Sequence, residues 1–322
     1  MSIPKVSIII PVYKVEEYIE KCARSLFSQT LDELEYIFID DCGNDNSFNI
    51  IDIIIDEFPH RRSQVRIIRN EFNRGVGQTR RHGIDVASGE YIIHCDPDDR
   101  VDSDMYQTLY EKAKLNDADV CICDYYVDNS AGETVVLQNA ESDKKALFHQ
   151  LSSETLHAAL WNKMVRSDLA KRFPIETGIN LWEDLSVMPL ILLSANRIAK
   201  VDRPLYHYNM ANSGSVSHID YAKNVVSSVN AVNSLIKNMR KHNLIDIVNP
   251  IDLYRLQWSA KKGLILDPTK DNIRRWQETF PESNSHFRQL DISPKFKFLT
   301  WLAIHNQVLL LKLYKKVKSL RK

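Results

Sequence analysis

Apolar runs typical of β-strands alternate with segments of helical periodicity through the first 125 residues of the chain. Residues 6–10 form a nearly continuous β-branched run, which is typical of a strand buried on both faces, and we expect Pro11 to end it. Strands are predicted at residues 6–10, 35–40, 65–69, 90–95 and 118–127, and helices at 16–30, 48–58, 75–88 and 104–116. This alternation predicts an α/β fold with a mostly parallel, Rossmann-like sheet and flanking helices.

From residue 130 onward the pattern is less regular. Residues 156–172 and 180–195 are predicted to be helical, and residues 197–217 to form a strand, a turn at Pro204, a second strand and a polar loop. The next part is predicted to be mainly helical, with breaks near Pro250, Pro268, Pro281 and Pro294. We divide the chain into a domain at 1–217 (halves 1–125 and 126–217), a helical region at 218–294, and a C-terminal helix at 295–322.

The overall charge balance conceals an asymmetry. The 322 residues are 44% apolar and 26% charged, which is ordinary for a soluble globular protein, and 42 basic residues balance 42 acidic ones. Eight Lys and Arg and no Asp or Glu lie between Lys295 and the end, so the first 294 residues hold 34 basic and 42 acidic residues. A basic C-terminal segment of this kind indicates an anionic partner.

The cysteines and the apolar runs indicate a cytoplasmic location. The five cysteines are scattered without a C-x-x-C pair, and three of them lie in strand-like runs, so we expect buried, reduced thiols. The N-terminus has only a short apolar run followed by charges, so no signal peptide is expected. No uncharged apolar run is long enough to predict a helix that spans a membrane.

Polar residues gather where the predicted parallel strands end. Ligands of such sheets bind at the carboxyl ends of the strands. The residues in question are Tyr13, Asp40, Asp41, Asn73, Arg74, Asp96, Asp98 and Asp99. The cluster of Asp96, Asp98 and Asp99 suits Mg²⁺ or Mn²⁺, which prefer oxygen ligands, although an acidic turn that caps the next helix would leave the same pattern. No phosphate-binding glycine loop and no zinc-ligand spacing occurs.

Several motifs, in order along the chain, resemble those of the glycosyltransferases of family 2, which have the GT-A fold. They include the opening strand, loop and helix, a strand that ends in paired aspartates, and a helix and strand that lead into "DPDD". A Glu-Asp pair and a closing segment complete the set. The motifs lie at residues 6–30, 35–47, 73–99, 182–185 and 204–217. Within that family, the chain resembles the bacterial sugar transferases that build exopolysaccharide, capsule and lipopolysaccharide.

The resemblance implies a binding site for a UDP-sugar donor. Tyr13, after Pro11, would pack on the uracil ring, and Asp41 would accept its N3–H. Asn73 and Arg80 would lie beside the nucleotide, and a guanidinium suits diphosphate by its charge and fork geometry.

The same resemblance assigns the remaining donor-side residues. Asp96 would hold the ribose, Asp98 would bind the metal, and Asp99 would be an alternative metal ligand or would support the ligands. His207 and Ser213 would approach the diphosphate, although His207 could equally have a structural role. One departure from the family's pattern is Thr79-Arg80-Arg81, where Ala-Arg-Asn is common.

The reaction implied is an inverting transfer of a hexose or N-acetylhexosamine to an acceptor hydroxyl. Asp184 is our candidate general base, and Glu183 would orient the acceptor. The alternative is that these residues are acidic only because a helix begins there. A nucleotidyltransferase, or a module that binds sugar nucleotides without catalysis, stays open as a second class.

The C-terminal segment leaves two interpretations open. Residues 298–311 are uncharged but too short to span a membrane, and His305 interrupts the apolar pattern. Either this helix packs on the body of the protein, or it lies on an anionic membrane surface. Family acceptors are often lipid-linked saccharides, which favours membrane contact. Nucleic acid is not among the predicted partners.

Overall fold

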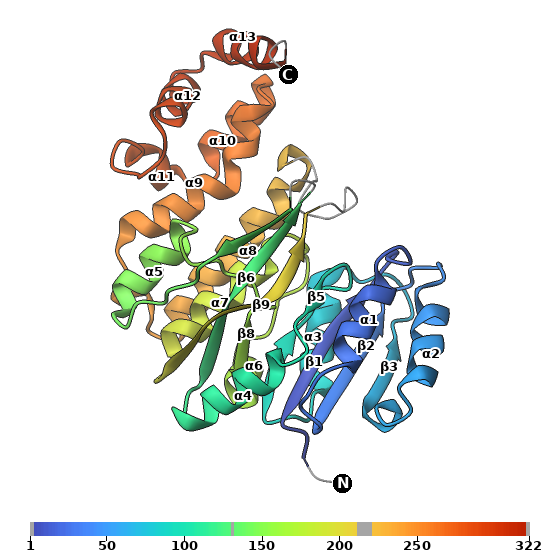
Figure 1. Cartoon of the computed structure of the whole chain (residues 1–322). Coiled ribbons are helices and arrows are strands. Elements are labelled where there is room, and N and C mark those ends of the chain that lie inside the picture. The colour runs from blue at the N-terminus through green and yellow to red at the C-terminus, as the bar shows by residue number, and fades with distance from the viewer. Residues whose placement is uncertain (1–2, 130–131, 211–220, 320–322) are drawn as a thin grey trace.

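The protein is described here from a computed structural model, which describes residues 3–129, 132–210 and 221–319. The strands are β1 Val6–Val12, β2 Leu34–Asp40, β3 Val65–Arg69, β4 Tyr91–His94, β5 Arg100–Val101, β6 Val120–Asn129, β7 Gly132–Val136, β8 Lys163–Arg166 and β9 Ile198–Asn209. The α-helices up to residue 194 are α1 Ile19–Phe27, α2 Ser47–Glu57, α3 Val76–Val86, α4 Met105–Leu115, α5 Lys144–Ser152, α6 Ser167–Arg172 and α7 Glu183–Ser194. The α-helices after the sheet are α8 Tyr221–Lys241, α9 Pro250–Leu266, α10 Lys270–Glu278, α11 Pro281–Ser285, α12 Pro294–Ile304 and α13 Val308–Ser319. Figure 1 shows the sheet in the lower part of the molecule and the last helices above it.

The nine strands form one sheet in the order β3-β2-β1-β4-β8-β6-β9-β5, with β7 paired to β6. The first four strands in this order are parallel from β3 to β4, in a register that pairs Val6 with both Leu34 and Tyr91. The carboxyl ends of β1, β2, β3 and β4 therefore meet at one edge, as the sequence predicts. Strand β8 runs antiparallel to both β4 and β6, while β6 and β9 are parallel. The predicted α/β architecture with flanking helices is confirmed.

The sheet is buried on both faces by two apolar clusters. Alternate side chains of β1 point to opposite faces, so Ile8 and Ile10 pack with α1, α2 and α4, while Ile9 packs on the other side. That second side is covered by side chains from α3, α5, α6, α7 and α8. A third cluster, around Trp258 and Trp276, holds the C-terminal helices together. Because β1 is buried on both faces, its carboxyl end is a rigid support for the residues that follow it.

Four local predictions are wrong, each because a tertiary contact outweighs local sequence. Strand β1 continues through Pro11 to Val12, because a residue whose amide is not needed can stay in a strand. Residues 156–172 do not form one helix: they contain β8, which pairs with β4 and β6, and then α6. Pro204 lies within β9, where the register shifts, rather than at a turn between two strands.

The fourth correction concerns the C-terminal segment, which forms two helices rather than one. Helix α12 ends at Ile304 and α13 begins at Val308. Asn306 between them has a φ of 55°, a backbone conformation that ends the first helix. Prolines begin helices α9, α11 and α12, where a missing amide costs no hydrogen bond. Among the described residues no helix is both long and apolar enough to cross a membrane.

Candidate active site

Strand β9 holds the acidic loop that follows β4. The Tyr206 hydroxyl accepts a hydrogen bond from the Asp96 amide (3.0 Å) and donates one to the Asp99 carboxylate (2.6 Å). The Asn209 amide donates to the other oxygen of Asp99 (2.7 Å), and its side chain donates to the carbonyl of Asp98 (3.1 Å). The loop is thus fixed by two residues that are more than a hundred positions away in the sequence.

The three aspartates of this loop differ in their surroundings. Asp99 is buried, and both of its carboxyl oxygens accept hydrogen bonds from β9. Burial, with the negative charges of Asp98 and Asp96, raises the pKa of Asp99 well above its usual range. The side chain of Asp96 keeps 22% exposure at the edge of the sheet. This placement suits Asp99 to supporting the loop, which is one of its two predicted roles.

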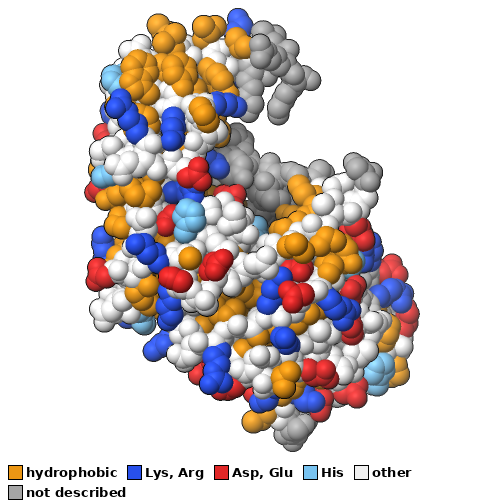
Figure 2. All heavy atoms as spheres, turned by 60° about the vertical axis from the view of Figure 1, so that its left-hand side comes forward, with side chains coloured by type: hydrophobic (Ala, Val, Ile, Leu, Met, Phe, Trp, Pro, Cys, Tyr) orange, Lys and Arg blue, Asp and Glu red, His pale blue; other side chains and the backbone are white. Residues whose placement is uncertain are grey.

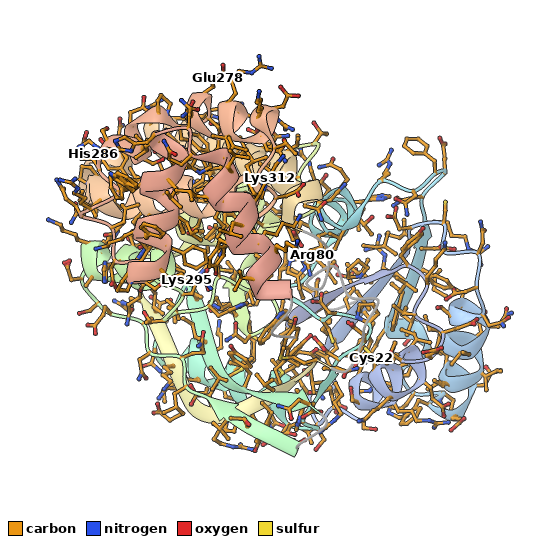
Figure 3. The ribbon with its side chains drawn as sticks, turned by 90° about the horizontal axis from the view of Figure 1, so that it is seen from above. Cys22, Arg80, Glu278, His286, Lys295 and Lys312 are labelled. Atoms are coloured by element: carbon orange, nitrogen blue, oxygen red, sulfur yellow. The ribbon has the colours of Figure 1, made fainter. Side chains whose placement is uncertain are left out.

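Arg80 joins the two acidic parts of the site. Its guanidinium is buried and donates to Asp96 across 2.6 Å and, through its other amino group, to Glu183. Burial and the neighbouring negative charge of Asp184 together raise the pKa of Glu183 to about 7, against the opposing positive charge of Arg80. Figure 3 places Arg80 near the middle of the molecule, between the N-terminal strands and the C-terminal helices. Helix α3 therefore links the acidic loop to the start of α7.

Glu183 and Asp184 occupy the first turn of α7. Two carboxylates there are favourable because the amino end of a helix carries partial positive charge. Trp182, just before them, has a φ of 66°, a left-handed conformation that costs free energy in a residue other than glycine. Asp184 is half-buried, and across the described ranges no hydrogen bond to its carboxylate is found. Its predicted role as the general base stays a prediction.

The residues predicted to bind the nucleotide follow β1, β2 and β3. The buried Asp41 carboxylate accepts from the amides of Arg74 (2.8 Å) and Gly75 (2.9 Å) and from Asn70 (2.9 Å). A carboxylate has about four acceptor positions, and these hydrogen bonds fill three of them. Tyr13 is 43% exposed at the end of β1, where its ring can receive a flat partner.

Two further predicted residues have less direct support. Asn73 is exposed, and its side chain accepts a hydrogen bond from the Gly75 amide. Pro11 is buried within β1. Neither arrangement tests the predicted contact with a nucleotide.

His207, on β9, lies within a network of charged groups from β5, β7 and the residues that follow β5. It is buried, bonded to Asp102 (2.9 Å) and Glu133 (3.1 Å), and stacked on Tyr126. Arg100 binds the same Glu133, so these groups already compensate one another. His207 thus has the surroundings of a structural histidine, and its predicted approach to the diphosphate stays a prediction. Ser213 lies outside the described residues.

Helix α3 approaches the loop before α7 closely, which the sequence analysis did not predict. A Cβ atom on Gly77 would lie 2.1 Å from the carbonyl oxygen of Ile179, and one on Gly75 would collide with Asn180. The pair Gly75 and Gly77 is too short to be read as a phosphate loop, but glycines at a helix start do signal close backbone approach. This contact brings Arg80 within reach of Glu183.

A parallel nucleotide-binding half, an acidic loop after β4 and a Glu-Asp pair across from it define a glycosyltransferase of the GT-A class. The chain belongs to glycosyl transferase family 2, whose model matches residues 7–173. It is 32% identical over 228 residues to the uncharacterized glycosyltransferase EpsJ of Bacillus subtilis. That alignment covers 68% of this chain and 64% of the relative, slightly less than two thirds of its length.

Solved structures show the same fold at low sequence identity. S. aureus TarS 1–349 in complex with UDP-GlcNAc superimposes with a TM-score of 0.65 at 16% identity, over 99% of this chain and 92% of that chain. The mannosyltransferase PcManGT from Pyrobaculum calidifontis, in complex with GDP-Man and Mn²⁺, superimposes with a TM-score of 0.56 at 13% identity. The latter match covers 99% of this chain and 85% of that chain.

Proposed function

We propose that the protein transfers a sugar from a UDP-sugar to a hydroxyl of a saccharide acceptor, with inversion at the anomeric carbon. The observation that carries the proposal is Arg80, which ties Asp96 of the strand-end loop to the Glu-Asp pair that begins α7. This arrangement sets a donor site and a base on either side of one edge of the sheet. The UDP-GlcNAc complex of the structurally similar TarS supports a uridine donor.

The proposed donor site extends along that edge. Tyr13 packs against the uracil, and the remaining acceptor position of Asp41 receives its N3–H. Asp96 would receive ribose hydroxyls, and Asn73 would lie beside the nucleotide. An approach of His207 to the diphosphate would require it to leave its bonds to Asp102 and Glu133. Both terminal amino groups of Arg80 are bound to carboxylates, so its proposed contribution to diphosphate binding is the positive potential it supplies beneath the site.

The residues present fit a divalent cation. Asp96 and Asp98 offer hard oxygen ligands on a loop that β9 holds in place, and burial together with the charges of Asp98 and Asp96 raises the pKa of Asp99. We assign Asp98 as the main ligand of Mg²⁺ or Mn²⁺, with Asp99 as support. A bound cation would neutralise the charge that grows on the leaving diphosphate. The Mn²⁺ complex of PcManGT supports this assignment.

Asp184 is the proposed general base. It would remove the proton from the acceptor hydroxyl as that oxygen attacks the anomeric carbon from the face opposite the leaving group. Glu183, held by Arg80, fixes the first turn of α7 and so the direction of the Asp184 carboxylate. A single base with direct displacement gives inversion.

The acceptor and its setting complete the proposal. We propose a lipid-linked saccharide as the acceptor, and synthesis of a surface polysaccharide at the cytoplasmic face of a membrane as the context. The domain division at 1–217, 218–294 and 295–322 stays a proposal. Its first boundary lies outside the described residues, and β6 runs through residue 125, so the two halves of the first domain share that strand.

The test is a screen of UDP-sugars for metal-dependent release of UDP, followed by Asp184→Asn. Because a general base contributes about 10²–10⁴-fold, the variant should lose at least about 10²-fold in kcat and keep its affinity for UDP-sugar in calorimetry. Asp85→Asn, an exposed aspartate paired with Arg81, is the control and should keep its rate. Loss of donor binding in Asp184→Asn would place this residue in the donor site instead. Unchanged transfer would show that it is not the base.

A further inference from the structure

The outward faces of α12 and α13 carry large apolar side chains in contact with solvent. On α13, Leu309, Leu310, Leu313 and Val317 are exposed by 81%, 48%, 58% and 43%. Their spacing places them along one side of a helix. On α12, Phe298 and Trp301 are exposed by 58% and 40%. We call these six residues the outer apolar face.

The fold does not need this face, because the same helices pack through their other side. Leu299 and Leu302 of α12 and Leu311 of α13 are buried in the cluster around Trp258 and Trp276. The Trp258 indole also donates to the Thr300 hydroxyl (2.9 Å). Both helices are thus anchored, and the outer apolar face is presented on a firm support.

Positive charge surrounds the outer apolar face. Lysines occur at positions 295, 297, 312, 315 and 316, and no Asp or Glu follows Asp291 in the sequence. Lys295 lies over the Phe296 and Tyr314 rings, 5.6 Å and 5.4 Å from their centres, and Lys315 pairs with Asp267. Figure 2 shows hydrophobic and basic side chains intermixed over the upper end of the molecule, where Figure 1 places α12 and α13. A partner for this surface must therefore be both apolar and anionic.

We propose that the outer apolar face docks on a lipid bilayer that contains anionic lipids. The leucines, Phe298 and Trp301 would enter the boundary between headgroups and acyl chains, and the lysines would contact lipid phosphates. Both helices are too short to cross the bilayer, so they would lie in the plane of its surface. The proposal goes beyond the proposed function and does not depend on it.

The test is flotation of the full chain with vesicles of neutral phosphatidylcholine alone or mixed with anionic phosphatidylglycerol. The unchanged protein should bind the anionic vesicles, and added salt should weaken this binding without abolishing it. Leu309→Glu combined with Leu313→Glu should lower partitioning by at least about tenfold, because burial of two leucines is lost. Lys312→Glu should weaken binding mainly to the anionic vesicles. The controls are Leu115→Glu, at a leucine that is 84% exposed on α4, and Lys21→Glu on α1.

A second measurement does not require a charged residue to be introduced into the outer apolar face. Brominated lipids should quench tryptophan fluorescence of the unchanged protein, and Trp301→Phe should remove most of that quenching. Equal flotation of the Leu309 and Leu313 variant and the Leu115 control would overturn the proposal. So would quenching that is absent or that does not depend on Trp301. A protein that ignores vesicles but forms dimers that Leu309→Glu dissociates would show that a second copy covers this face.

Discussion

Replacement of Arg80 by Gln should destabilise the protein strongly, and more so at alkaline pH. The guanidinium is buried between Asp96 and Glu183. Removing one partner of a buried ion pair costs about 3–5 kcal/mol. The Asp96 side chain is 22% exposed and can be hydrated once Arg80 is gone, which lowers the cost, whereas the Glu183 side chain is only 9% exposed and cannot. Because only one of the two carboxylates stays without water, we expect the lower end of the range, about 3 kcal/mol.

The pH dependence follows from Glu183, whose folded-state pKa of about 7 already lies above the unfolded value. A carboxyl with a raised pKa favours the folded state less as pH rises, because the unfolded state can ionise it freely. Loss of Arg80 raises this pKa further. At about pH 6 both proteins hold Glu183 mostly neutral, so the difference in unfolding free energy should be smaller there, where it comes mainly from Asp96, and should widen toward about pH 9.

The assay is urea unfolding followed by tryptophan fluorescence at these two pH values. Arg81→Gln is the matched control, because Arg81 is exposed and pairs with Asp85 at 3.6 Å, and should cost at most about 1 kcal/mol. Arg80→Gln combined with Glu183→Gln should recover part of the lost stability, since no buried charge is left unpaired beside α7. The reasoning would be refuted if the losses of unfolding free energy in the Arg80 and Glu183 single variants simply added up in the double variant. Equal urea midpoints for the Arg80 and Arg81 variants would refute it as well.

Three further predictions concern the metal, the helix contact and a buried lysine. Asp98→Ala should abolish the divalent-cation dependence of UDP release and keep the urea midpoint; full activity of the unchanged enzyme in excess chelator would contradict this. Gly77→Ala should cost about 1–3 kcal/mol and lower kcat, because its Cβ would lie 2.1 Å from the carbonyl of Ile179; a normal melting curve would show that the loop can move aside. Burial lowers the pKa of Lys163 to about 7, so the folded state binds fewer protons than the unfolded state above that pH. The unfolding free energy of the unchanged protein relative to Lys163→Met should therefore rise between about pH 7 and about pH 10, and a flat difference in urea unfolding would contradict it.

Local sequence was sufficient for the architecture of the first half. Burial of β1 on both faces requires the continuous apolar run at its start, and the helices that follow show their own period. The strand-end positions of Asp41 and Asp96 follow from the alternation alone, because parallel strands bring their carboxyl ends to one edge. The family was also recognisable from the order of the motifs. These features depend on residues close together in the chain.

Contacts between distant residues decided what the sequence did not reveal. Strand β8 forms within an apparently helical stretch because β4 and β6 offer it hydrogen-bonding edges on both sides. Likewise, the chain turns at Asn306, with a φ of 55°, and one face of both α12 and α13 then packs into the cluster around Trp258 and Trp276.

The same applies to the candidate site. Arg80 reaches Glu183 across 103 positions, and Tyr206 reaches Asp99 across 107. A side chain's periodicity shows which face of an element it occupies, but only the folded chain determines which charge it meets there. The sequence therefore determined which residues line the edge of the sheet. The tertiary structure decided that Arg80 holds two carboxylates together and that Asp99 faces β9, because burial makes such charges depend on partners that local sequence does not specify.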